Sequence, residues 1–251
     1  GLMNADQPLS AGAGPSVLAV DVGGTDLKAA VLDREGRLGP IRRIPTPRSA
    51  DNPGSAVVSA IAAIAAESAV DALGVTVPGH VDESRGLGIR STNLGWRDFP
   101  FGRTIRAATG MPTAIAHDVR AAGEAEYRIG AARGVSDVAV VTIGTGIAAA
   151  LRFDGRPYTG RGNAGELGHT DVDPTGPECR CGNRGCLEAI ASAGAMVRRY
   201  QEGGGSAASA AEVLARALDG EPLADRIWTA ALDALTAGLS ILSSVVAPEL
   251  I

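Results

Sequence analysis

The chain contains one short pattern twice, and the two copies lie 121 residues apart. In each copy an apolar run rich in β-branched residues ends at a glycine turn, and a second apolar run follows. The first copy spans residues 17–32 around the turn GGT, and the second spans residues 138–153 around the turn GTG. Such a pattern is typical of a two-stranded hairpin. Because there are only two copies, the repeat predicts two related lobes and not a solenoid.

The rest of the chain alternates between helical and extended patterns. Apolar residues at helical spacing predict helices, whereas short apolar runs between glycine and proline breaks predict strands. Together these patterns indicate an α/β fold. The predicted strands are 17–21, 27–32, 37–44, 72–77, 113–116, 138–143, 147–153 and a segment from Arg156, and the predicted helices are 55–68, 103–109, 119–127, 187–200, 207–218 and 223–246.

The predicted lobes divide the chain between His117 and Asp118. A small N-terminal α/β lobe spans residues 17–117, and a larger C-terminal α/β lobe spans residues 118–251. Residues 1–16 are expected to be a disordered tail or a tag, because they lack the basic start and apolar centre of a signal peptide. The chain stops at PELI, which is typical of the beginning of a strand. We therefore expect the last strand and helix of the C-terminal lobe to be missing.

Composition narrows the class of protein. The net charge of −5 does not favour a nucleic-acid partner. We see no apolar stretch of about 20 residues, so no membrane-spanning segment is expected. The three cysteines are clustered, which argues against a disulfide scaffold and for a reducing compartment. We therefore expect a cytoplasmic protein with no nucleic-acid or membrane partner.

All three cysteines fall within eight residues, and a histidine lies ten positions before the first of them. The spacing H-x9-C-x-C-x4-C offers three thiolates and one imidazole, which are preferred zinc ligands, and four such ligands close a tetrahedral structural site. The alternative is a group of free or oxidised thiols, but their clustering favours a metal. A closed site leaves no position for a metal-bound water. We therefore predict structural zinc held by His169, Cys179, Cys181 and Cys186.

The two glycine turns are candidate phosphate sites, because a glycine turn leaves backbone N–H groups uncovered that can point at phosphate oxygens. One turn alone is as typical of an ordinary hairpin corner as of a phosphate site. Two equivalent turns favour a clamp on the phosphates of a nucleotide. No P-loop sequence occurs. Asp21, just before the first turn, is placed to hold Mg²⁺ through water. The candidate nucleotide-binding residues are Asp21, Gly23, Gly24, Thr25, Gly144, Thr145 and Gly146.

Asp118 stands where a predicted strand ends and a predicted helix begins. An aspartate at such a position is most simply a helix N-cap. Its place between the two glycine turns favours a second role, in which the carboxylate takes the proton from a hydroxyl group.

These motifs resemble those of the ROK family (repressors, open reading frames, kinases) of the actin-like ATPase superfamily, over residues 17–251. The segment GELGH…CRCGNRGCLE is similar to the family's signature. DVGGT and IGTG are similar to its two phosphate motifs, and STNLGW is similar to its sugar-contacting loop. The resemblance implies a two-lobe, ribonuclease H-like fold with mixed five-stranded sheets and flanking helices. It also implies that nucleotide and sugar bind in the cleft between the lobes.

The resemblance further implies an ATP-dependent sugar kinase with Asp118 as the general base for the attacking hydroxyl. His169 would hold zinc on one ring nitrogen and face the sugar with the other. Family members are often dimers or tetramers, so a homo-oligomer is expected. The sugar-binding residues that the resemblance implies are Asn93, His117, Asp118, Glu166, His169 and Glu188.

His117 departs from the family pattern, in which an asparagine that contacts the sugar usually precedes the catalytic aspartate. Histidine is bulkier and can carry charge, so His117 could alter the sugar preference. The alternative is that His117 is a tolerated substitution. Phosphorylation of the 6-hydroxyl of glucose is the leading hypothesis, with ATP or polyphosphate as donor. The alternatives are a kinase for another hexose or an N-acetylhexosamine such as N-acetylmannosamine, and a non-catalytic sugar-binding protein or transcriptional regulator. Family regulators carry a helix-turn-helix domain ahead of the first strand, for which 16 residues are too few.

Overall fold

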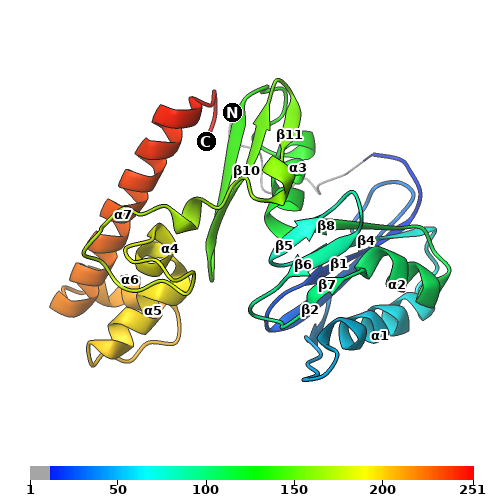
Figure 1. Ribbon diagram of the computed structural model, residues 1–251, viewed down its shortest axis with the longest axis horizontal. Helices are drawn as coiled ribbons and strands as arrows, with labels where there is room; N and C mark the ends of the chain where they lie inside the picture. Colours follow the sequence, from blue (N-terminus) through cyan, green and yellow to red (C-terminus); the bar gives the residue numbers. More distant parts are fainter. Residues whose placement is uncertain (1–11) are drawn as a thin grey trace. The chain divides into compact units, whose positions relative to one another are not determined.

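A computed structural model describes residues 12–251, and residues 1–11 of the predicted tail lie outside the described part. The chain forms two compact units (Figure 1). The first contains residues up to Gly134 together with Gly160–Asn163, and the second contains Val135–Thr159 and Ala164–Ile251. The boundary predicted between His117 and Asp118 therefore falls inside the first unit. The reason is that helix α3 follows strand β8 directly and packs against β8 and β4.

The first unit is built on a mixed five-stranded sheet in the order β3-β2-β1-β4-β8. Strand β4 pairs in parallel with both β1 and β8, and the other pairs are antiparallel. The predicted strand 37–44 is shorter than expected and begins after Pro40, which has no N–H to donate to a ladder. The strands are β1 (Val17–Val22), β2 (Asp26–Leu32), β3 (Arg42–Pro45), β4 (Ala72–Val77) and β8 (Thr113–His117).

Three helices and a small second sheet complete this unit. Helices α1 and α2 pack on each other, and Asn52 caps α1 by accepting a hydrogen bond from the Ser55 N–H. The small antiparallel sheet β5-β6-β7 was not predicted, because its strands are three or four residues long and contain polar residues and glycine. These elements are α1 (Pro53–Ala66), α2 (Phe101–Thr109), α3 (Asp118–Ile129), β5 (His80–Asp82), β6 (Leu87–Arg90) and β7 (Arg97–Phe99).

The second unit contains an antiparallel sheet in the order β11-β10-β9. The expectation of five strands in each lobe is wrong here, because the described part of this unit forms three strands. Leu250 makes one parallel bridge to Val138, beside the outer edge of β9. The strands are β9 (Val138–Ile143), β10 (Ile147–Phe153) and β11 (Arg156–Tyr158).

Four helices pack beside this sheet. The single helix predicted over residues 187–200 is two helices, because Ser192 has extended backbone angles (φ −68°, ψ 152°). The Ser192 hydroxyl accepts a hydrogen bond from the Ala195 N–H and so caps the second of them. The helices are α4 (Leu187–Ala191), α5 (Ala193–Glu202), α6 (Ala210–Leu218) and α7 (Pro222–Val246), with the short 3₁₀ turn η2 (Leu167–His169). The other 3₁₀ turn, η1 (Gly160–Gly162), belongs to the first unit.

Helix α7 bears on the expectation that the chain has no membrane-spanning segment. Its 25 residues are long and apolar enough to cross a membrane, by length and composition alone. One such helix is weak evidence for a span, since helices that pack on protein cores pass the same test. One face of α7 does pack on the core of its unit, where Gly238 meets Leu187 of α4. The buried residues of that face are Ala224, Ile227, Ala231, Ala234, Gly238 and Leu242.

Candidate functional site

The first glycine turn joins β1 to β2 and is held by the segment that follows β3. The Gly23 N–H donates to the Asp26 carbonyl at 3.0 Å, which closes the turn. The Thr46 hydroxyl donates to the Gly23 carbonyl at 2.7 Å, and Arg48 donates to the Gly24 carbonyl at 2.7 Å. The carbonyl oxygens of the turn are therefore fixed by side chains from another loop.

Asp21, the predicted magnesium-binding residue, already has two partners. Its Oδ1 accepts from the Thr76 hydroxyl at 2.9 Å, and its Oδ2 lies 3.4 Å from the Lys28 ammonium. The sequence DVGGTDLK departs from the usual family order at Asp26 and Lys28, and the hairpin centred on GGT places Lys28 directly opposite Asp21. A hydrated cation at Asp21 would have to share this carboxylate with Lys28 or displace it.

Asn93, a predicted sugar contact, packs against the first glycine turn. Its side-chain amide lies so close to Gly24 that a methyl group at that position would overlap the amide nitrogen. The first unit therefore places one predicted sugar residue directly beside one predicted phosphate turn.

The second unit repeats this arrangement with different residues. The Gly144 N–H donates to the Gly146 carbonyl at 2.9 Å, and the Gly144 carbonyl accepts from the Ala193 N–H at the start of α5. Glu188 of α4 accepts from the Ile147 N–H at 2.9 Å through Oε2. A methyl group at Gly146 would lie 2.6 Å from that same oxygen. A predicted sugar residue again packs on a predicted phosphate turn.

Asp118 is the first residue of α3 and is not its N-cap. The N-cap is His117, whose side chain makes no capping hydrogen bond. The Asp118 Oδ1 accepts from the Val119 N–H at 2.8 Å and lies 3.2 Å from His117 Nε2. The Asp118 side chain is 42% exposed. A half-exposed carboxylate at a helix N-terminus is stabilised by the helix dipole and stays accessible to a ligand.

Glu83 and Arg120 hold the end of strand β8 directly before Asp118, and no local sequence pattern predicts either contact. The Glu83 Oε1 accepts from the His117 backbone N–H at 2.9 Å and from Arg120 Nε at 2.8 Å. Arg120 also donates to the Val81 carbonyl at 3.0 Å. These partners lie 34 to 39 positions apart along the chain, so only the folded structure brings them together.

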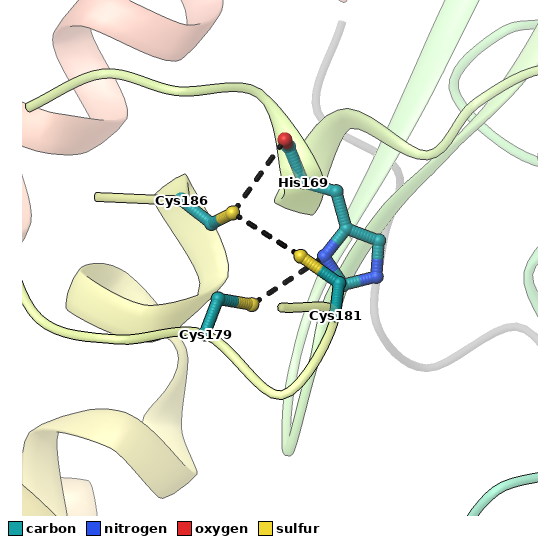
Figure 2. A group of neighbouring side chains, drawn as sticks. All are labelled: His169, Cys179, Cys181 and Cys186. Carbon is teal, nitrogen blue, oxygen red and sulfur yellow. Dashed lines mark hydrogen bonds between the residues drawn. The ribbon is translucent and has the colours of Figure 1, made fainter. Parts of the chain in front are cut away.

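The four predicted metal ligands form one cluster (Figure 2). Their ligand atoms all lie within 4.8 Å of one another. Cys181 Sγ lies 3.6 Å from Cys186 Sγ, and Cys179 Sγ lies 3.7 Å from His169 Nδ1. Zn–S bonds of about 2.3 Å separate the ligands of a tetrahedral site by about 3.8 Å. These two separations match that spacing, so the four side chains fit a zinc ion in ligand type and in their two shortest separations.

The cluster is built on a tight turn that brings the three sulfurs together. The Cys179 N–H donates to the Asn183 carbonyl at 2.8 Å. Gly185 has φ +71° and packs so tightly on the Asp173 carbonyl that any side chain would overlap it.

Burial raises the pKa of the Cys186 thiol to about 12, and the Asn183 backbone N–H lowers the pKa of Cys181. Without a cation, Cys186 would therefore stay protonated at neutral pH.

Glu166 and His169 lie at the edge of this cluster. His169 Nδ1 faces Cys179, and the other ring nitrogen points away from the sulfurs (Figure 2). That second nitrogen, Nε2, lies 3.9 Å from the half-exposed Glu166 carboxylate. The predicted double role of His169 requires one nitrogen on the metal and the other on a ligand, and it stays a prediction.

The mixed sheet with flanking helices and the two glycine hairpins define a protein of the actin-like ATPase fold. The model of the ROK family matches residues 17–251. The chain belongs to the ROK family.

Two curated relatives are named sugar kinases. The chain is 32% identical to a glucokinase from Streptomyces coelicolor over 206 residues, which are 82% of this chain and 65% of the glucokinase. It is 37% identical to an N-acetylmannosamine kinase from Citrobacter koseri over 214 residues, which are 84% of this chain and 73% of that kinase. The chain thus spans slightly less than two thirds of the glucokinase.

A solved structure shows the same fold. The ROK family glucokinase from Streptomyces griseus, in complex with glucose and AMPPNP, matches with a TM-score of 0.77 and 32% identity. The match covers 93% of this chain and 80% of that glucokinase.

Proposed function

We propose that the chain is an ATP-dependent hexose kinase that phosphorylates the 6-hydroxyl of glucose. One observation carries this proposal: each unit packs a sugar-binding candidate directly on its own phosphate-binding turn. Asn93 lies on Gly24 in the first unit, and Glu188 lies on Gly146 in the second. A kinase needs this proximity because the acceptor hydroxyl must reach the terminal phosphate of the nucleotide. The glucose and AMPPNP bound to the Streptomyces griseus relative support this choice of substrates.

In the proposed reaction Asp118 accepts the proton of the sugar hydroxyl. The hydroxyl oxygen attacks the γ-phosphorus of ATP, the bond to the β–γ bridging oxygen breaks, and ADP leaves. Backbone N–H groups of the two glycine turns stabilise the phosphate charge. Asp21 would hold Mg²⁺, which would neutralise charge on the nucleotide, and the cysteine cluster would hold a structural zinc ion.

In this proposal the two carboxylate oxygens of Glu188 have different partners. Oε2 is committed to the Ile147 N–H, so Oε1 is the oxygen that can accept a hydrogen bond from a sugar hydroxyl. Glu166 and His169 Nε2 complete the sugar contacts of the second unit.

A sugar panel tests the proposal. Glucose, mannose, N-acetylmannosamine and N-acetylglucosamine are offered with ATP–Mg²⁺ or polyphosphate, and the sugar phosphate formed is quantified. We expect glucose with ATP to give the highest kcat/KM. A higher value for N-acetylmannosamine would favour the activity of the Citrobacter koseri relative. If no combination of sugar and phosphate donor gave a sugar phosphate, the kinase function would be refuted. A sugar-binding protein or a regulator would then be the remaining alternatives.

Replacing Gly146 by alanine tests the contact between Glu188 and the second turn. The new methyl group would lie 2.6 Å from Glu188 Oε2, so the carboxylate must move. We expect glucose affinity, measured by calorimetry, to fall about tenfold, which corresponds to about 1.4 kcal/mol. Gly144→Ala is the matched control for sugar binding, since a methyl group there meets no atom within 4 Å. Equal glucose affinities in the two variants would show that this contact does not position Glu188.

A further inference from the structure

We propose that His117 is a positioning residue that makes the availability of the base Asp118 depend on pH. As an imidazolium it would pair with Asp118 Oδ1 and make the carboxylate a weaker proton acceptor for the sugar hydroxyl, and as a neutral imidazole it would leave the carboxylate a stronger acceptor. This inference rests on the proposed kinase function, because it assigns a regulation to the same base.

The contact between the two side chains is direct. His117 Nε2 lies 3.2 Å from Asp118 Oδ1, which is ion-pair distance once the imidazole is protonated. The same oxygen accepts the Val119 N–H at 2.8 Å. Oδ1 is therefore engaged from two sides, and Oδ2 is the oxygen best placed to take a proton from a substrate.

The burial of the two side chains differs in a way that suits this role. His117 is 12% exposed, whereas Asp118 is 42% exposed. The imidazole is thus held mostly within the protein beside a carboxylate that faces solvent. A sugar can reach Asp118 more readily than it can reach His117, so His117 is better placed to act through Asp118 than to bind the sugar itself.

The backbone of His117 is held firmly, which keeps the contact in place. Its N–H donates to Glu83 Oε1, and Arg120 Nε donates to the same oxygen. His117 also pairs with Val77 at the end of the parallel β4–β8 ladder. The Cα atom of His117, from which the imidazole side chain extends, is therefore held in place beside Asp118.

Asp118 is the charged group that lies 3.2 Å from the imidazole, and the other charges near β8 have the following places. Glu83 is close to the His117 backbone, but its charge is paired with Arg120. Strand β4 carries no titratable side chain. On α2, Arg106 donates to the Thr113 carbonyl at the opposite end of β8. The titratable groups on the elements packed against β8 are Asp118 and Arg120 near the start of α3, Glu124, Glu126, Tyr127 and Arg128 further along it, His80 and Asp82 on β5, and Arg103 and Arg106 on α2.

The charge of the His117 imidazole determines the direction in which turnover changes with pH. Histidine changes charge near pH 6.5, and a neighbouring carboxylate favours its charged form. A carboxylate paired with a cation is a weaker proton acceptor. Turnover should therefore fall as the pH drops through the range in which His117 gains a proton. An asparagine, the usual residue in the family, has no charge to gain there.

The kinetic test compares kcat/KM for the sugar between pH 5 and 8.5 in three proteins. In the unaltered chain we expect an acid limb near the histidine range, with a fall of about tenfold per pH unit below it. His117→Asn and His117→Gln remove the titrating group but keep a polar amide. Both should retain activity at pH 5.5, with the acid limb moved at least one unit lower. Identical acid limbs in all three proteins would overturn the proposal. An altered sugar ranking with an unmoved acid limb would instead make His117 a sugar contact.

A second measurement does not depend on turnover. The chain has three histidines, so their imidazole signals can be followed by NMR during a pH titration. We expect the His117 signal to titrate at a lower pH in Asp118→Asn than in the unaltered chain, because the negative charge is gone. An unchanged titration midpoint would refute the pairing whatever the kinetics show. A shifted midpoint in a chain without kinase activity would keep the pairing and refute only the proposed function.

Discussion

Asp118→Asn is expected to lower kcat for sugar phosphorylation by about 10²–10⁴-fold, the range that a positioned general base contributes. Asparagine has nearly the same shape as aspartate, and its Oδ1 can still accept the Val119 N–H that fixes the native side chain. The substitution therefore removes the proton acceptor and leaves the start of α3 intact. We expect glucose affinity to change by less than about threefold, or about 0.6 kcal/mol.

The measurement combines steady-state ADP release with calorimetric titration of glucose. Asp233→Asn is the control, because it makes the same chemical change at an exposed position on α7. Asp118→Asn with turnover close to that of the control would remove Asp118 from the mechanism. Loss of both turnover and glucose binding would point to a structural role for the carboxylate at the strand end.

The elements with strong local patterns could be predicted from the sequence. Strands β4, β9 and β10 have the bounds that their apolar runs indicated, because glycine, proline or aspartate marks their ends. The convergence of the cysteine cluster also followed from spacing alone, since its ligands lie within a short segment. In each case the information that determines the structure lies close together along the chain.

The parts that were missed depend on contacts between distant residues. The sheet β5-β6-β7 consists of strands too short to show a period. The contacts of Glu83 with Arg120 and of Glu188 with Ile147 span 37 and 41 positions. The break at Ser192 has a local cap, but helix-forming residues on both sides hide it. Sequence patterns identified the candidate residues, whereas tertiary structure was needed to show which of them touch.

The second unit links its glycine turn and its cysteine cluster through one short helix. Helix α4 begins directly after Cys186, and its second residue, Glu188, bonds the strand that leaves the turn. The Gly144 carbonyl of the turn is in turn bonded by the Ala193 N–H at the start of α5. A change in the cluster would therefore shift Glu188 relative to the turn. In the proposed kinase this gives the metal an influence on the sugar site although it takes no part in the chemistry.

Cys181→Ser is expected to abolish zinc binding and to destabilise the second unit. Cys181 is exposed, and replacing an exposed thiol by a hydroxyl would ordinarily change stability by about 0.5 kcal/mol or less. If Cys181 holds zinc, the loss is much larger. A metal present at 1,000 times its dissociation constant stabilises the folded state by about 4 kcal/mol. For a protein of this size that loss lowers the unfolding temperature by about 8–16 °C.

Elemental analysis should find about one zinc per unaltered chain and close to none in the Cys181→Ser variant. Arg180→Ala changes the exposed residue between Cys179 and Cys181 without removing a ligand, so it should keep both the zinc and the unfolding temperature. Because Cys186 leads directly into α4, the variant should also bind glucose more weakly through the displaced Glu188. A Cys181→Ser protein with the stability and glucose affinity of the Arg180→Ala control would show that the four side chains converge without a structural metal.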